Sequence, residues 1–149
     1  STPEKQLILE LTESCKVSDP NGLRDDFEYF KNMGINMALD DFGTEYSSIA
    51  LLRKLKPQWI KIDHTFVRSI QDDEMDQAIL EYIMNLSKQT RIKVCVEGVE
   101  NKEILSVVQT YKPELLQGYY YSRPCPAEEF SKKYFNGKDK TGSYGCLKK

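Results

Sequence analysis

The chain has 149 residues, 40% of them hydrophobic and 11% aromatic, which is enough to build the core of a single domain. Its formal net charge of -2 at pH 7 gives no positive field of the kind that marks proteins binding DNA, RNA or a membrane surface. Without a run of about 18 apolar residues or a signal peptide, we expect a cytoplasmic segment that does not contact a membrane, any anchor of a parent protein lying upstream.

Short apolar runs alternate with amphipathic segments of helical periodicity along most of the chain. Turn and cap residues separate them, among them Gly34, Pro57 and an N-cap at Asp72 or Asp73. In chain order the predicted elements are a strand at 7–10, a helix at 23–33, a strand at 35–39, a helix at 47–55, a strand at 58–63, a helix at about 73–86, a strand at 92–96, a helix at 102–111, a strand or strand end at 117–121 and a helix at 127–134.

This alternation predicts an α/β fold of parallel strands joined by right-handed crossovers. Five such units fit the C-terminal five strands of a TIM-like (β/α)8 barrel, whose first part would lie upstream, or alternatively an open parallel sheet. If the barrel is the correct alternative, residues 1–135 would form its C-terminal portion. Residues 136–149 contain few apolar side chains and are predicted to form a disordered tail.

Two adjacent carboxylates, Asp40 and Asp41, stand where the second apolar run meets a Gly-containing turn. In α/β folds the carboxyl ends of the strands carry the ligand site, because the loops there project over the sheet. A turn with two solvated acids is the alternative reading. The other polar residues at predicted strand ends are Glu10, Lys61, Asp63, Glu97, Glu100 and Gln117.

On a barrel these strand ends would converge, and carboxylates that converge repel one another unless cations neutralise them. An all-oxygen cluster indicates a hard divalent metal, Mg²⁺ or Mn²⁺. Two such ions could support an in-line phosphoryl displacement, with Lys61 orienting the attacking water. A simple ion pair of Lys61 with Asp63, and a helix-start acid pair at Glu97 and Glu100, are the alternatives.

The remaining candidate groups indicate no further site. Four cysteines without Cys-x-x-Cys spacing are expected to be reduced thiols and not a zinc site; they are Cys15, Cys95, Cys125 and Cys146. The single histidine, His64, is predicted to be a loop residue and not a ligand.

Five motifs occur in a characteristic order: Glu10-Leu11-Thr12-Glu13, Asp40-Asp41-Phe42-Gly43-Thr44, Lys61-Ile62-Asp63, Glu97-Gly98-Val99-Glu100 and Gln117-Gly118-Tyr119. In these motifs the chain resembles the EAL-domain cyclic-di-GMP phosphodiesterases from about Leu7 to Phe130. The resemblance implies a TIM-type barrel that hydrolyses cyclic di-GMP to linear pGpG with two Mg²⁺ or Mn²⁺ ions.

The resemblance also implies roles for individual residues. Glu10, Asp40 and Asp41 would be metal ligands, with Asp40 bridging two ions, and Glu97 would serve the second ion directly or through water. Lys61 would hold the nucleophilic water, and Gln117 would contact solvent near the metals. The supporting residues would be Glu13, Thr44, Asp63 and Glu100.

The chain lacks the Glu-Ala-Leu strand and the upstream Asn ligand of that family, and Glu45 stands where the family has Gly. The isolated chain is therefore expected to be inactive or very weakly active. We expect a homodimer, or association with an upstream barrel fragment. Two alternatives are a non-catalytic module that binds cyclic di-GMP or a protein partner, and a barrel lyase that uses Lys61 as a Schiff base.

Overall fold

The computed structural model describes residues 7–12, 20–44 and 48–135. Its strands are β1 (Ile8–Thr12), β2 (Asn36–Phe42), β3 (Trp59–Ile62), β4 (Lys93–Val96) and β5 (Leu115–Leu116). Its helices are α1 (Pro20–Asn32), α2 (Ser48–Leu55), α3 (Glu74–Thr90), α4 (Lys102–Val108) and α5 (Ala127–Tyr134), with short 3-10 turns η2 (His64–Phe66) and η3 (Gln109–Tyr111). Glu13, Glu45, Cys15, Cys146 and the predicted tail at 136–149 lie outside the described residues.

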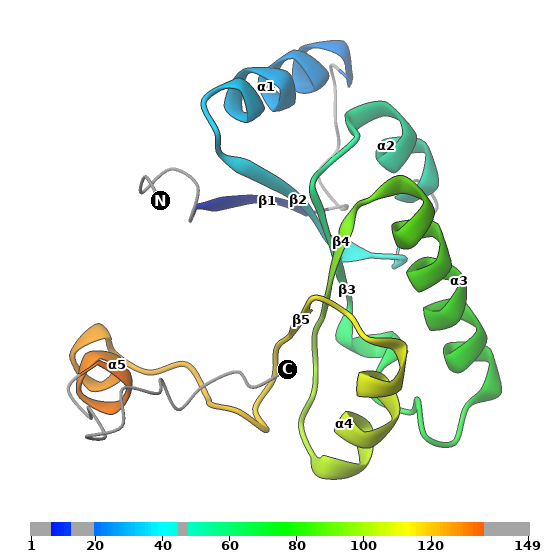
Figure 1. Cartoon of the computed structure of the whole chain (residues 1–149), viewed down its shortest axis with the longest axis vertical. Coiled ribbons are helices and arrows are strands. Elements are labelled where there is room, and N and C mark those ends of the chain that lie inside the picture. The colour runs from blue at the N-terminus through cyan, green and yellow to red at the C-terminus, as the bar shows by residue number, and fades with distance from the viewer. Residues whose placement is uncertain (1–6, 13–19, 45–47, 136–149) are drawn as a thin grey trace.

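The five strands form one parallel sheet in the order β1-β2-β3-β4-β5. Because each crossover adds the next strand on the same side, α1 to α4 all cover one face of the sheet (Figure 1). A doubly wound sheet would instead reverse its strand order and carry helices on both faces. The sequential order is that of a (β/α)8 barrel, as the sequence predicted.

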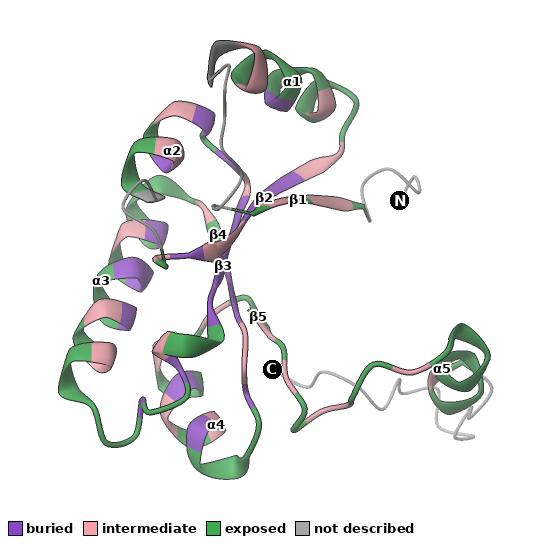
Figure 2. Ribbon diagram, turned by 180° about the vertical axis from the view of Figure 1, so that it is seen from behind, coloured by how far each residue is buried: buried purple, intermediate pink, exposed green. Residues whose placement is uncertain are grey.

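The main core lies between the sheet and these helices. Strand residues such as Leu39, Ile60, Ile62 and Val94 are 0–1% exposed there, and the buried positions follow the strands and the inward helix faces (Figure 2). The opposite face of the sheet carries a smaller cluster of Ala38, Trp59 and Cys95, against which Ile8 packs. Alternation along each strand thus separates a helix-covered face from a face that corresponds to a barrel interior.

Helix α5 stands apart from the other helices in both views (Figures 1 and 2). None of its residues is buried, and the rings of Phe130 and Tyr134 pack on each other with centroids 4.7 Å apart. No helix among the described residues has the length and apolar character needed to cross a membrane.

Most predicted boundaries differ from the observed ones by a few residues, and the fifth strand was placed wrongly. The strand or strand end was predicted at 117–121, but β5 is Leu115–Leu116 and residues 119–121 form a turn. After Gln117 the chain bonds to the loop that follows β4: Val99 N–H donates to Gln117 O at 3.1 Å, and Tyr120 N–H donates to Val99 O at 2.9 Å. Gly118 crosses so closely that a Cβ atom there would overlap the Val99 backbone. This contact between loops distant in sequence ends the strand.

The predicted N-cap of α3 is confirmed at Asp73, whose carboxylate accepts hydrogen bonds from the backbone N–H groups of Met75 and Asp76. Gly34, with φ 84°, follows α1 in the left-handed conformation expected of a C-terminal cap residue. Asp73 thus marks where α3 begins, and Gly34 ends α1 shortly before β2 begins.

Candidate functional site

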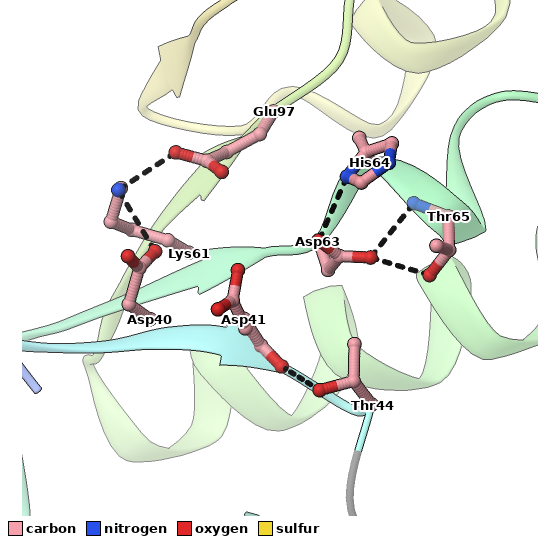
Figure 3. Close-up of polar contacts among 8 residues, drawn as sticks. All are labelled: Asp40, Asp41, Thr44, Lys61, Asp63, His64, Thr65 and Glu97. Carbon is pink, nitrogen blue, oxygen red and sulfur yellow. Dashed lines mark hydrogen bonds and ion pairs between the residues drawn. The ribbon is translucent and has the colours of Figure 1, made fainter. Parts of the chain in front are cut away.

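A β-bulge brings Asp40 and Asp41 to the same site. Pairing of β2 with β3 runs to Leu39 opposite Ile60 and resumes at Phe42 opposite Ile62, so β2 contains one extra residue. Asp41 takes a left-handed backbone with φ 54°. In a regular strand adjacent side chains point to opposite faces, whereas here both carboxylates turn toward β3 and β4 (Figure 3).

Glu97 completes this group from the end of β4. Asp40, Asp41 and Glu97 each offer a carboxylate oxygen, and these oxygens all lie within 4.8 Å of one another. We call these three residues the carboxylate cluster. The register places Glu97 correctly, because its N–H donates to Ile62 O and continues the ladder by one residue beyond the strand. Two strands, β2 and β4, therefore supply the three carboxylates of one small site.

Lys61 lies beside the cluster, with its ammonium between strands. Its Nζ atom lies 2.7 Å from Glu97 Oε1, 2.8 Å from Asp40 Oδ1 and 2.9 Å from Glu10 Oε2. Burial alone would lower the pKa of Lys61, but the ion pairs with Asp40, Glu97 and Glu10 outweigh it and raise that pKa. Lys61 is therefore held as an ammonium, which disfavours the Schiff-base reading, since that chemistry requires a neutral amine.

The cluster holds more negative charge than Lys61 neutralises. Burial raises the pKa of Glu97, with Asp40 and Glu10 adding to the rise, although Lys61 opposes it. Burial and then the Asp40 charge raise the pKa of Asp41. Asp40 Oδ1 and Glu97 Oε1 are buried near the Lys61 ammonium, yet within the described residues neither accepts a hydrogen bond of favourable geometry. Three carboxylates whose oxygens lie this close together suit a hard divalent cation.

Glu10 contacts the site differently. Its Oε2 accepts a hydrogen bond from Lys61, and its side chain is 42% exposed. Glu10 does not belong to the carboxylate cluster, whose oxygens all lie within 4.8 Å of one another. In this arrangement Glu10 joins the carboxylate cluster through Lys61.

Asp63 anchors the chain that leaves β3. Its carboxylate accepts hydrogen bonds from Thr65 N–H and Thr65 Oγ1, at 2.9 and 2.5 Å, and pairs with His64 Nδ1 at 2.9 Å. Burial would raise the pKa of Asp63, but the bonds from Thr65 and His64 outweigh it and hold that pKa below its usual range. Asp63 thereby caps η2 (Figure 3). His64 and Thr65 were not predicted as partners of Asp63, although Asp followed two residues later by Thr is a cap signal.

Three other predicted residues lie at the same edge with looser connections. Thr44 Oγ1 donates to the Asp41 carbonyl oxygen at 2.9 Å and so holds the turn after the cluster. Gln117 directly follows β5 at the level of Glu97, and Glu100 lies on the loop after Gly98. Both side chains are exposed and have no polar partner within the described part of the chain.

Comparisons with known proteins match this arrangement. The family model described as EAL domain matches residues 1–124. The chain is 35% identical over 131 residues to the cyclic di-GMP phosphodiesterase NbdA of Pseudomonas aeruginosa, covering 86% of this chain and 17% of that protein. It is also 35% identical over 124 residues to the oxygen sensor protein DosP of Escherichia coli, covering 83% of this chain and 16% of that protein.

Solved structures agree. A standalone EAL protein of Vibrio cholerae with bound cyclic di-GMP superposes with a TM-score of 0.77 at 33% identity, covering 82% of this chain and 52% of that one. The Klebsiella pneumoniae protein BlrP1, in complex with manganese and cyclic di-GMP, gives 0.76 at 33% identity, covering 82% of this chain and 31% of that one.

The chain thus spans about half of that standalone EAL protein and about a fifth or less of its first curated relatives. The likeness to EAL structures confirms the predicted fold, an α/β portion of a TIM-like barrel. The family model covers most of the chain, and the matched residues contain the whole carboxylate cluster. The chain belongs to the EAL domain family.

Proposed function

We propose that this chain is the C-terminal part of a phosphodiesterase that hydrolyses cyclic di-GMP to linear pGpG. The observation that supports the proposal most is the carboxylate cluster, in which oxygens of Asp40, Asp41 and Glu97 lie within 4.8 Å of one another beside the Lys61 ammonium. A relative named for cyclic di-GMP phosphodiesterase activity and EAL structures with bound cyclic di-GMP support the same substrate.

Asp40, Asp41 and Glu97 would hold divalent ions, two of them and either Mg²⁺ or Mn²⁺, with Glu10 contributing as a further ligand. When bound, such ions would stabilise the negative charge that develops on the phosphate and lower the pKa of the attacking water. The donor set suits them, because it consists of carboxylate oxygens and includes two buried oxygens without a well-aligned hydrogen bond.

The chain's other residues would position the reactants. Lys61 remains an ammonium, so it would donate hydrogen bonds to the attacking water and orient it, and would not remove its proton. Gln117, exposed beside Glu97, would contact solvent near the reacting phosphate. Asp63 fixes the end of β3 through Thr65 and His64, and Thr44 fixes the turn after Asp41, so both support the cluster without touching substrate.

Within the described residues the sheet ends at β1 and β5, so the active assembly would include the rest of a barrel. That complement would come from the upstream part of the same protein. For the chain alone, a second copy or an upstream fragment would cover the open face.

The test is hydrolysis of cyclic di-GMP by the protein that contains the complete EAL barrel, followed by chromatographic detection of pGpG. We expect turnover with Mg²⁺ or Mn²⁺ and none in EDTA, and very weak turnover by the 149-residue chain alone. Binding of cyclic di-GMP without pGpG formation in the complete protein would support the non-catalytic alternative instead. Metal-independent hydrolysis would contradict the proposed site.

A further inference from the structure

A second concave site lies at the opposite end of the sheet from the carboxylate cluster. It is a groove of about 720 Å³ between α2 and α3, beside the starts of β3 and β4. Leu52, Pro57, Leu86 and Ile92 are among the apolar residues that line it. It is built on the middle strands, so neighbours that pair with the sheet edges at β1 or β5 would not fill it.

All the charged residues that line the groove are basic. Five basic residues line it and no acidic residue does, although the whole chain carries 23 acidic and 21 basic residues. These five residues are Lys31, Arg53, Lys56, Arg91 and Lys93. Lys93 lies 5.1 Å from the centroid of the Trp59 ring, and the other four form no ion pair within the described ranges. The groove therefore gathers five cations, and no acidic residue lines it.

Helix ends account for part of this charge. Lys31 and Arg53 lie in the last turns of α1 and α2, and Arg91 caps α3, positions where cations favourably meet the helix dipole. Lys56 and Arg91, however, have left-handed backbones with φ 47° and 61°. Gly or Asn would adopt this backbone conformation with less strain. Two long cations at strained positions on one groove point to a binding role.

The groove also presents an aromatic and a hydrogen-bond donor surface. Tyr82 is 60% exposed and Ile49 is 52% exposed, although both line it. Gln58 Oε1 already accepts a hydrogen bond from Met37 N–H, which leaves its amide hydrogens to donate. Thr90 Oγ1 donates its hydroxyl proton to Leu86 O, so Thr90 is not counted among the donors for a ligand. The matching ligand carries several anionic acceptors together with a flat apolar group.

We propose that this groove binds a nucleoside polyphosphate, with its phosphates on Arg53, Lys56 and Arg91 and its base against Tyr82. The volume lies within the roughly 300–1,000 Å³ typical of small-molecule sites. Guanidinium and ammonium donors recognise phosphate oxygens, and an exposed tyrosine ring stacks on any base. The inference does not depend on the proposed phosphodiesterase activity, because the two sites lie at opposite ends of the sheet.

The test is isothermal titration calorimetry of the 149-residue chain with ATP in EDTA, which keeps metal–nucleotide complexes away from the carboxylate cluster. We expect saturable binding of ATP, weaker binding of pyrophosphate and none of adenosine. A hexaglutamate peptide, titrated in the same way, represents the alternative ligand, an acidic protein segment. If hexaglutamate binds more tightly than ATP, the groove is a site for an acidic protein segment and the proposal is wrong; absence of ATP binding at millimolar concentration overturns it as well.

Variants locate the binding. Lys56→Asn with Arg91→Asn removes two charges at positions where Asn suits the left-handed backbone, so the fold should persist, as circular dichroism would verify. We expect at least tenfold weaker ATP binding, because two charge-assisted contacts are lost, roughly 1.4 kcal/mol being tenfold. Lys54→Gln with Lys88→Gln is the matched control: it removes two cations from the ends of the same helices, outside the groove lining.

The control variant and an Asp40→Asn variant should both bind ATP as the unmodified chain does. Equal weakening in the groove and control variants would show that ATP responds only to overall charge, and would overturn the proposal. Loss of binding in Asp40→Asn would place the nucleotide in the carboxylate cluster and overturn it too.

Discussion

Lys61 and Glu97, which neighbouring strands bring together from 36 positions apart in the sequence, form an ion pair of 2.7 Å, and the same ammonium lies 2.8 Å from Asp40. One cation thus partly neutralises a site that holds several carboxylates. The negative charge of the carboxylates is balanced only when a further cation binds. The stability of the folded chain and the affinity of the site for that cation are therefore linked.

Replacing Lys61 should expose this linkage. The Lys61 side chain is only 10% exposed. Lys61→Met keeps most of the side-chain volume but removes the ammonium, which leaves carboxylates that repel one another. We expect the free energy of unfolding in EDTA to fall by about 2–4 kcal/mol. Mn²⁺ should recover more stability in Lys61→Met than in the unmodified chain. Urea unfolding with and without Mn²⁺ measures both. Lys88→Met, at an exposed position of α3, is the control, and an equal effect of the two substitutions would contradict the linkage.

Asp40 should be essential for turnover. In the protein with the complete barrel, Asp40→Asn should lower the rate of cyclic di-GMP hydrolysis by roughly two or more orders of magnitude, because it removes a charge from the proposed metal site. Asp25→Asn, an exposed acid on α1, should leave the rate unchanged. Steady-state kinetics with saturating Mn²⁺ decides the matter, and unmodified rates in Asp40→Asn would refute its assignment.

Two glycines should respond to alanine for different reasons. Gly118→Ala places a methyl group against the Val99 backbone, which cannot move aside without shifting Gln117; we expect a loss of about 2–4 kcal/mol in unfolding free energy. A Cβ atom added at Gly34 would have no neighbour within 4 Å. We therefore expect Gly34→Ala to lower the unfolding free energy by only about 1–2 kcal/mol, the cost of holding Ala in the left-handed backbone conformation. Thermal unfolding of both variants provides the comparison. A Gly34 variant as damaged as the Gly118 variant would argue against the close crossing of the two loops.

Cys95 should resist alkylation. Its burial, with a smaller contribution from Glu97, raises the pKa of the thiol from 9.0 to about 12, so almost no thiolate forms near neutral pH. Cys125 is partly exposed and should react with iodoacetamide faster than Cys95, as peptide mass spectrometry would show. A pKa raised by folding means that Cys95 stabilises the fold fully below pH 9.0 and that this contribution is lost as the pH rises toward 12. Equal alkylation rates for the two thiols in the folded chain would contradict the burial of Cys95.

The chain alone should associate. Strands β1 and β5 are the edges of the described sheet, and α5 buries none of its residues. Large apolar side chains are exposed near β5 and on α5, among them Leu115, Tyr119 and Phe130. Unpaired edges and apolar patches favour pairing with another chain. Light scattering coupled to size exclusion should give a mass above the 17.3 kDa of one chain. A stable monomer would contradict this expectation.

Local signals in the sequence were sufficient for most of the fold. Period-two apolar runs and caps such as Asp73 placed the strands and helices within a few residues, because those features depend on neighbours along the chain. The turn at residues 119–121 could not be predicted in this way. It depends on Gly118 crossing Val99, a contact that no periodicity encodes.

The candidate site, too, could be predicted only in part from the sequence. Its residue types and their positions at strand ends could be recognised from sequence, but the triple contact of Lys61 could not, since Glu10 lies 51 residues away and Asp40 and Glu97 lie on other strands. The pairing of His64 with Asp63 was also missed, because a histidine in a connecting segment has many equally plausible partners.

The bulge in β2 means that the site depends on the number of residues in the strand as well as on their kind. Deleting either aspartate would restore regular pairing with β3 and leave a single carboxylate at the edge. Inserting one residue before Asp40 would turn the pair out of register with Lys61. A substitution at Asp40 or Asp41 removes a carboxylate but leaves the number of residues in β2 unchanged. An insertion or deletion in β2 would instead move both carboxylates relative to Lys61, so the site constrains the length of this strand in the gene.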